Sequence, residues 1–262
     1  MKNSAIQFPE YDISELHPKR TKFCVCIPVI NEGRKIVKQL QKMSNLSSSI
    51  DIIIADGGSS DGSLDLDRLR DWGVKVLLIK TGTGRQSAQL RMAFHYALIL
   101  QGYQGVITVD GNDKDNVAAI PDFIKKLEEG YDFVQGSRFM PGGKAINTPM
   151  MRLIPIKLIH VPAISYLAGF KYSDTTNGFR AYSRRLLLDK NLQIFRDIFE
   201  TYELLAYMSV KAPQAGYKVT EIPVERSYPM NSETPTKISP VKGNIKILQI
   251  LFEMFLHKYD AK

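Results

Sequence analysis

Short apolar runs alternate along the chain with segments whose apolar residues recur at helical spacing. The first run, Phe23 to Ile27, ends in Pro28 and precedes a polar loop and a helical pattern. Further runs begin at Ile50, Val74 and Gly105. Strands that alternate with helices in this way are typical of a mostly parallel sheet covered by helices. The sequence therefore predicts an α/β fold.

The second half of the chain adds strands and two apolar helices. Met150 to Phe170 is nearly wholly apolar but carries Arg152 and Lys157, which fits a core helix or an element at a membrane interface. Its longest uncharged stretch, Leu158 to Phe170, falls short of the roughly 20 apolar residues that a membrane span needs, so no spanning helix is predicted. The last helix has a wide apolar arc that core packing, a dimer contact or a membrane surface would bury. The predicted strands of this half are Tyr131 to Gln135 and Val219 to Val224.

The chain has 262 residues, of which 44% are hydrophobic, so it can bury one substantial core. Residues 1–21 lack periodicity and are predicted to form an N-terminal extension. Residues 22–240 are predicted to form one catalytic domain, and residues 241–262 a C-terminal amphipathic helix.

The formal net charge of +8 favours anionic partners such as nucleotide diphosphates or phospholipid surfaces. Nucleic acid is not predicted, because a zinc-ligand spacing and an RNA-binding aromatic motif are missing. The only cysteines, Cys24 and Cys26, lie two residues apart in a strand and point to the same face. They are predicted to be buried thiols, which fits a reducing cytoplasm. Acidic residues interrupt the N-terminus, so a secretory signal is not expected.

An acidic cluster follows the strand that begins at Gly105. Its oxygen-bearing side chains are Asp110, Asn112, Asp113 and Asp115. Hard cations such as Mg²⁺ and Mn²⁺ prefer oxygen ligands, and Mg²⁺ is usually held by one or two carboxylates plus substrate phosphates. The cluster predicts a metal site, although solvated turn residues have the same composition.

Two more polar loops follow the first two strands. Asn31-Glu32-Gly33 lies after the first strand, and the loop from Asp56 to Ser63 after the second. Small residues of the second loop expose backbone N–H groups, which suits a nucleoside. Ligands of open α/β sheets bind beyond the carboxyl ends of the strands, so these loops and the acidic cluster are predicted to converge.

These residues carry a resemblance to a known family. The segments that carry it are Ile27–Gly33 (IPVINEG), Ala55–Ser63 (ADGGSSDGS), Val109–Asp113 (VDGND), Gly136–Phe139 (GSRF) and Asp174–Tyr182 (DTTNGFRAY). In this order they resemble the motifs of family-2 inverting glycosyltransferases, nearest to the dolichol-phosphate mannose synthase-like branch. The resemblance runs from about Phe23 to Lys237. It implies a GT-A fold, a nucleotide-diphosphate sugar donor and Mg²⁺ or Mn²⁺.

The resemblance also implies roles for single residues. Metal binding falls on Asp110, Asn112 and Asp113, where Asn112 stands in place of the second acid of a D-x-D pattern. Asp174 is placed near the sugar and acceptor, with a catalytic role. A structural ion pair for Arg138 and a solvated surface position for Arg85 are the alternatives at those sites. The residues implied in donor binding are Pro28, Asn31, Glu32, Asp56, Gly58, Ser59, Arg85, Arg138 and Lys237.

A general base is needed when the acceptor is a neutral hydroxyl. A helix predicted over Ile198 to Ala212 carries Glu200, Glu203 and Tyr207 on one face. The resemblance favours Glu203 as the base, against the alternative of a surface carboxylate. A phosphate acceptor is already anionic and would need no base.

The predicted function is metal-dependent inverting transfer of a sugar to a polyprenyl phosphate or to a glycan or glycolipid. The predicted location is the cytoplasm, on the inner face of the membrane, with peripheral membrane contact and homo-oligomer formation left open. A non-catalytic sugar-nucleotide-binding scaffold and a nucleotidyltransferase are the alternatives. The second is disfavoured, because Pro28 to Glu32 lacks the glycine-rich basic loop that it would use.

Overall fold

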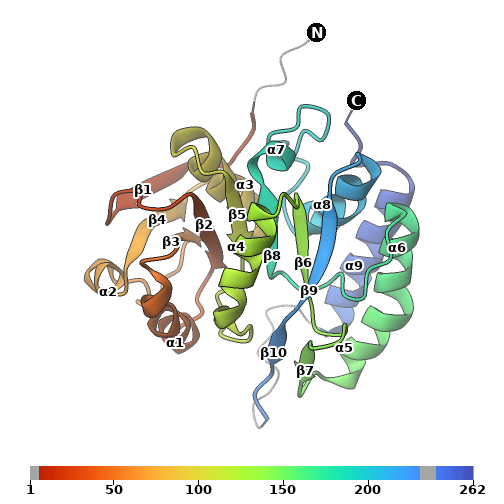
Figure 1. Ribbon diagram of the computed structural model, residues 1–262, viewed down its shortest axis with the longest axis horizontal. Helices are drawn as coiled ribbons and strands as arrows, with labels where there is room; N and C mark the ends of the chain where they lie inside the picture. The colour runs from red at the N-terminus through yellow and green to blue at the C-terminus, as the bar shows by residue number, and fades with distance from the viewer. Residues whose placement is uncertain (1–5, 231–239, 262) are drawn as a thin grey trace. The chain divides into compact units, whose positions relative to one another are not determined.

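The computed structural model describes residues 6–230 and 240–261, with side chains from residue 246 onward in the second range. Its backbone forms two compact units. The first unit comprises Met1–Asp113 and Tyr182–Leu204, and the second comprises Lys114–Ala181 and Leu205–Lys262. The fold is a mixed α/β fold in which helices flank the strands (Figure 1).

The first unit is built on a mostly parallel sheet in the spatial order β1-β4-β3-β2-β5. Strands β2, β3, β4 and β5 pair in parallel, in register at Cys26↔Ile53 and Cys26↔Thr108. All six residues of β3 are buried, as expected for a parallel strand covered on both faces. The strands are β1 (Tyr11–Glu15), β2 (Phe23–Val29), β3 (Asp51–Asp56), β4 (Val74–Lys80) and β5 (Gly105–Thr108).

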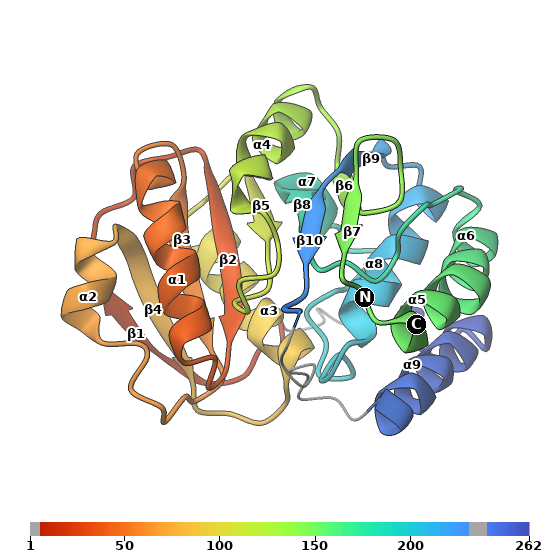
Figure 2. The same ribbon diagram turned by 90° about the horizontal axis from the view of Figure 1, so that it is seen from below.

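Helices cover both faces of this sheet. Helix α1 buries Ile36, Leu40 and Met43, whereas every residue of α3 from Ser87 to Phe94 is buried. In Figure 2, α1 lies in front of the strands and α3 behind them, as a reversal of strand order requires. The helical elements are α1 (Arg34–Met43), η1 (Ser44–Leu46), α2 (Leu66–Asp71), α3 (Gln86–Phe94), η2 (His95–Leu100) and α7 (Arg184–Leu187).

The second unit contains two pairs of parallel strands and most of the remaining helices. Strand β6 (Phe133–Ser137) pairs with β9 (Val219–Pro223), and β7 (Lys144–Ile146) pairs with β10 (Glu225–Ser227). Strand β8 (Arg180–Ser183) is divided between the units after Ala181. The helical elements are η3 (Val117–Ala119), α4 (Ile120–Glu128), α5 (Met150–Pro155), η4 (Ile156–His160), α6 (Val161–Ala168), α8 (Glu203–Gln214) and α9 (Pro240–Phe255). Helix α8 is divided between the units after Leu204, so Glu203 belongs to the first unit.

One continuous helix corrects the prediction that no segment is long enough to span a membrane. Elements α5, η4 and α6 join into Met150–Ala168, which is long and apolar enough to cross a bilayer by length and composition alone, and only 11% of it is buried. The uncharged stretch Leu158–Phe170 is bounded by Lys157 and Lys171, whereas the helix continues through Lys157 and Arg152 back to Met150. The helix ends where Gly169 adopts a left-handed φ of 64°.

Other expectations are confirmed or corrected. Cys24 and Cys26 are fully buried free thiols, as predicted. The ordered fold begins before Lys22, because Tyr11–Glu15 pairs antiparallel with β4 at the sheet edge. Helix α8 begins at Glu203 rather than Ile198, so Glu200 precedes the helix. The edge strand β1 and the first residue of α8 both depend on tertiary contacts, which the pattern of apolar residues in the sequence does not show.

Candidate active site

The loops after β2 and β3 are hydrogen-bonded to each other in the first unit. The Asn31 backbone N–H donates to Ser59 Oγ at 2.9 Å, and the Ser60 N–H donates to Asn31 Oδ1 at 2.8 Å. The Gly33 N–H donates to Asp61 Oδ2 at 2.8 Å. Asn31 adopts a left-handed φ of 47°, a conformation that asparagine tolerates better than most residues. The two loops predicted to converge therefore do so.

Two hydrogen-bonded carboxylates, the buried Asp56 and the exposed Asp61, shape the second of these loops. Asp56 is 3% exposed, and its oxygens accept from the Gly58 N–H at 3.1 Å and from Ser59 Oγ at 2.5 Å. For Asp61, burial raises the pKa, but hydrogen bonds from Ser63 and Gly33 outweigh it and hold the pKa below its usual range. Asp56 thus folds the loop whose backbone was predicted to meet a nucleoside.

The loop before α3 requires glycine and presents Arg85. Gly84 has a φ of 90°, and a Cβ atom there would lie 2.5 Å from that of Ala88. The Arg85 backbone N–H donates to the Glu200 carbonyl at 2.8 Å, and the Arg85 side chain is exposed. An exposed side chain fits both a diphosphate contact and a solvated surface arginine, so the role of Arg85 stays a prediction.

Asp110 lies just beyond β5 on the same sheet. Its Oδ1 accepts from Gln86 Nε2 at 3.2 Å, so the start of α3 orients this carboxylate. A Cβ atom at Gly111 would lie 2.8 Å from Val29 Cγ2 and 3.2 Å from the Pro28 carbonyl. Only glycine fits this close approach, which brings Asp110 beside the end of β2.

The other two acids of the cluster are engaged elsewhere. Asp113 Oδ1 forms an ion pair with Lys42 Nζ at 2.6 Å, while the Asp113 N–H donates to Gln39 Oε1 at 2.8 Å. Asp115 pairs with Arg226 in the second unit. Asp113 therefore faces Lys42 of α1 and Asp115 faces Arg226, and the predicted metal binding by Asp113 stays a prediction.

A metal site at Asp110 and Asn112 stays a prediction. Across residues 6–230 and 240–261, no three His, Cys, Asp or Glu side chains form a metal-binding group. One carboxylate and one amide oxygen nevertheless match a cation that takes its other ligands from substrate phosphates and water. The residues therefore fit Mg²⁺ or Mn²⁺ carried with a diphosphate.

Glu203 and Tyr202 lie at the start of α8. Glu203 is 4% exposed, and its carboxylate accepts from the Thr201 backbone N–H at 2.6 Å and from the Thr201 hydroxyl. Burial raises the pKa of Tyr202; the Arg85 charge lowers it, and Asp110 raises it further. The carboxylate predicted as a base thus accepts two hydrogen bonds from Thr201 just before α8. Its catalytic role stays a prediction.

The second unit contains a buried ion pair between Arg138 and Asp174. Arg138 Nε and Nη2 donate to the two Asp174 oxygens at 2.6 and 2.9 Å, and Nη2 also donates to Thr176 Oγ1 at 2.7 Å. Burial raises the pKa of Asp174, but the Arg138 charge outweighs it and holds the pKa below its usual range. Asp174 is fully buried. Arg138 is thus an ion-pair partner of Asp174, and the predicted roles of Arg138 in phosphate binding and of Asp174 in catalysis stay predictions.

Further cations surround Tyr228 in the same unit. Lys114 Nζ lies 4.8 Å from the centre of the Tyr228 ring, and the guanidinium carbons of Arg152 and Arg226 each lie 5.9 Å from it. Burial raises the pKa of Tyr228, but Arg226, Arg152 and Arg138 outweigh it and lower the pKa. We call Lys114, Arg152, Arg226 and Tyr228 the Tyr228 cluster. Sequence reasoning missed it, because its members come from three segments that are far apart in the chain.

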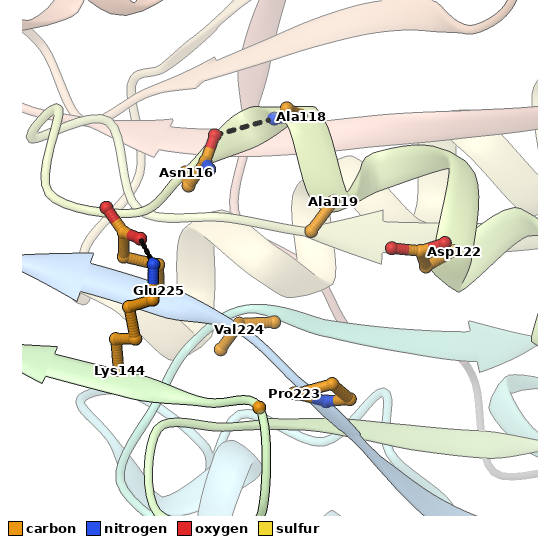
Figure 3. A pocket seen from close by; sticks show the side chains of 9 residues that line it. Asn116, Ala118, Ala119, Asp122, Lys144, Pro223, Val224 and Glu225 are labelled. Carbon is orange, nitrogen blue, oxygen red and sulfur yellow. Dashed lines mark hydrogen bonds and ion pairs between the residues drawn. The ribbon is translucent and has the colours of Figure 1, made fainter.

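A shallow pocket of about 260 Å³ lies beside β7 and β10. Figure 3 shows Asn116, Asp122, Lys144 and Glu225 around it. Lys144 Nζ is 3.2 Å from a Glu225 oxygen, so this lysine is paired at the surface. Lys237, the predicted phosphate clamp, lies outside the described residues.

Solved structures share this fold. Glucosyl-3-phosphoglycerate synthase from Mycobacterium tuberculosis, in complex with Mn²⁺, uridine-diphosphate and phosphoglyceric acid, superimposes with a TM-score of 0.62 at 15% sequence identity. The match covers 88% of this chain and 78% of that one. It confirms the predicted GT-A fold.

Curated relatives share 25–26% of their residues with this chain. Undecaprenyl-phosphate mannosyltransferase of Micrococcus luteus is 26% identical over 76% of this chain and 80% of its own length. Dolichyl-phosphate hexose transferase of Haloferax volcanii is 25% identical over 89% of this chain and 94% of its own length. Polyprenol monophosphomannose synthase of Mycolicibacterium smegmatis is 25% identical over 76% of this chain and 75% of its own length.

The family model "Glycosyl transferase family 2" matches residues 24–190. That range includes the loops after β2, β3 and β5 and the Arg138–Asp174 pair. The predicted activity class, a glycosyltransferase rather than a nucleotidyltransferase, is thereby confirmed. The chain belongs to glycosyl transferase family 2.

Proposed function

We propose that this protein transfers a hexosyl group, with inversion, from a nucleotide-diphosphate sugar to a polyprenyl phosphate at the cytoplasmic face of a membrane. The observation that carries the proposal is the Tyr228 cluster beside the Arg138–Asp174 pair. Arg226 and Arg138 form ion pairs with Asp115 and Asp174, and the charged groups of Arg152 and Lys114 lie over the Tyr228 ring. Such a group favours an anionic ligand. The names of the relatives, which include three transferases to lipid phosphates, support this acceptor class.

The first unit supplies the donor side of the proposal. The loops at Asn31 and Ser59, which are hydrogen-bonded to each other, offer backbone and side-chain groups to the nucleoside. The hydrogen bond from Ser59 to Asp56 stabilises the conformation of the second loop. The exposed Arg85 guanidinium meets the diphosphate. Asp110 and Asn112 would hold Mg²⁺ or Mn²⁺, which when bound neutralises charge on the departing diphosphate.

The second unit supplies the acceptor side. Asp174 fixes the plane of the Arg138 guanidinium through two hydrogen bonds, so the arginine does not need to be ordered when a phosphate binds. A phosphate oxygen is already negative and attacks the anomeric carbon without losing a proton. Glu203, with its oxygens engaged by Thr201, is then not required as a base and serves to fix the start of α8.

The test is an acceptor assay on the purified full chain with Arg152→Ala. UDP-, GDP- and dTDP-sugars are supplied with Mg²⁺ or Mn²⁺ or with chelator, and the acceptor is a polyprenyl phosphate or a free saccharide. Removing a charged hydrogen-bonding group typically costs about 1.5–3 kcal/mol, so KM for polyprenyl phosphate should rise roughly 10- to 100-fold while donor binding stays unchanged. The matched control is Arg68→Ala, since Arg68 is exposed on α2 in the first unit.

The proposal fails if product forms only with a saccharide acceptor. It also fails if Arg152→Ala and Arg68→Ala have the same KM for polyprenyl phosphate. Full activity in chelator would remove the metal from the proposal and leave the acceptor class standing.

A further inference from the structure

The second unit exposes apolar side chains on two helices that lie side by side. Helix α9 contacts both α5 and α6, and both views show them together (Figures 1 and 2). Between 50% and 72% of each apolar residue on this surface is exposed. Scattered exposed apolar residues are ordinary, but a concentration on neighbouring helices marks an interaction surface. We call it the helix-pair surface: Met150, Met151, Ile154, Leu158, Phe252 and Phe255.

Both helices are fixed to the protein by their opposite sides. A hydrogen bond of 2.7 Å joins His160 Nδ1 to Thr175 Oγ1, and Gln214 Nε2 donates to the Leu167 carbonyl at 2.7 Å. On α9, Ile250 and Met254 are buried. A helix held in this way presents one apolar side outward, so the geometry is that of an element lying on a surface rather than crossing a bilayer.

The positive charge of the helix Met150–Ala168 indicates which kind of surface it contacts. Between Met150 and Lys171 the chain contains Arg152, Lys157 and Lys171 and no aspartate or glutamate. Lys157 and Lys171 are exposed. Basic residues that flank an exposed apolar stripe match a bilayer with anionic headgroups, where each lysine or arginine near the surface contributes about 1 kcal/mol.

The same helix also reaches the proposed acceptor site. Arg152, one residue after Met151, lies over the Tyr228 ring, and its Nη1 is 3.5 Å from the Tyr228 hydroxyl. One helix thus exposes apolar side chains and contributes a cation to the Tyr228 cluster. A lipid-linked phosphate needs this combination, because its tail stays in the bilayer while its headgroup is bound by protein.

We infer that the helix-pair surface docks the second unit on an anionic bilayer, with its apolar side chains in the interfacial layer. The link to a lipid acceptor rests on the proposed function, whereas docking itself does not. Docking places the Arg152 end of the helix at headgroup depth, where a polyprenyl phosphate presents its phosphate.

The test is vesicle flotation of the full chain, with phosphatidylcholine vesicles and with mixed phosphatidylcholine and phosphatidylglycerol vesicles. Leu158→Ser combined with Phe252→Ser should lower partition into the mixed vesicles at least tenfold, because two apolar side chains lose their burial. Lys171→Glu should reduce the preference for the mixed vesicles several-fold. The matched control is Leu66→Ser with Leu100→Ser, two exposed leucines of the first unit, which should float like the parent.

Three results would overturn docking. The first is equal flotation of both double variants. The second is resistance of the bound chain to extraction at high pH, which would mean that the helix spans the bilayer. The third is a dimer in solution that Leu158→Ser and Phe252→Ser convert to monomer, which would mean that a second copy covers the surface. Assay of the unsubstituted chain with a water-soluble short-chain prenyl phosphate separates the two proposals, because a chain that is active but does not float supports the reaction and rejects docking.

Discussion

The two units differ in how their candidate site residues are arranged. In the first unit, Asn31, Asp56 and Asp110 each follow a strand of one parallel sheet, and the backbone of neighbouring loops supports them. In the second unit, the Tyr228 cluster draws its members from β10, from α5 and from loops. Buried Asp115 holds Arg226 of this cluster, and buried Asp174 holds Arg138. Strand-end sites follow from local sequence, whereas cation clusters follow from packing. We expect the first unit to govern the donor and the second the acceptor.

The largest effect is expected from Asp110→Ala, which tests whether the first unit governs the donor. Loss of the carboxylate that would hold a metal should remove several kcal/mol of charge stabilisation and lower turnover about 10³-fold or more. Metal-dependent donor binding, measured by calorimetry, should be lost. Asp67→Ala, at an exposed carboxylate of α2, is the control. Near-normal turnover would show that Asp110 is not a metal ligand.

The second unit is best tested for stability with Asp174→Asn. This change leaves the buried Arg138 without its carboxylate and should lower the free energy of unfolding by about 3–5 kcal/mol. The pKa of Asp174 is lowered in the folded state, so its contribution is present above the unfolded pKa of about 4 and is lost as pH falls through the folded value. Denaturant titrations should therefore show the two proteins converging in acid. A constant difference from neutral pH down to strong acid would contradict this account of the ion pair.

The smallest effect is expected from Glu203→Gln. With polyprenyl phosphate the turnover should fall less than about tenfold, because an anionic acceptor needs no base. A loss of roughly 10²- to 10⁴-fold would instead indicate general-base catalysis on a neutral hydroxyl. A thermal melt of the variant checks that the contact with Thr201 at the start of α8 survives. This result decides whether the first unit acts on the acceptor as well as on the donor.

The sequence by itself determined the class of fold and the strand-end loops. Alternation of apolar runs with helical patterns is a local property, and buried parallel strands such as β3 require continuous β-branched residues. Glycine and asparagine positions marked the turns, as at Asn31 and Gly84, because few other residues adopt those conformations. Motif order then indicated the family that the comparisons confirmed.

Only the tertiary structure decided which polar side chains have partners. Asp113 and Asp115 have the same chemistry as Asp110 in the sequence, yet each is paired with a cation more than 70 residues away. The Tyr228 cluster and the exposed side of Met150–Ala168 were likewise set by packing. Ion pairing and burial depend on three-dimensional neighbours, so a one-dimensional pattern identifies candidates for chemistry but not which of them are engaged elsewhere.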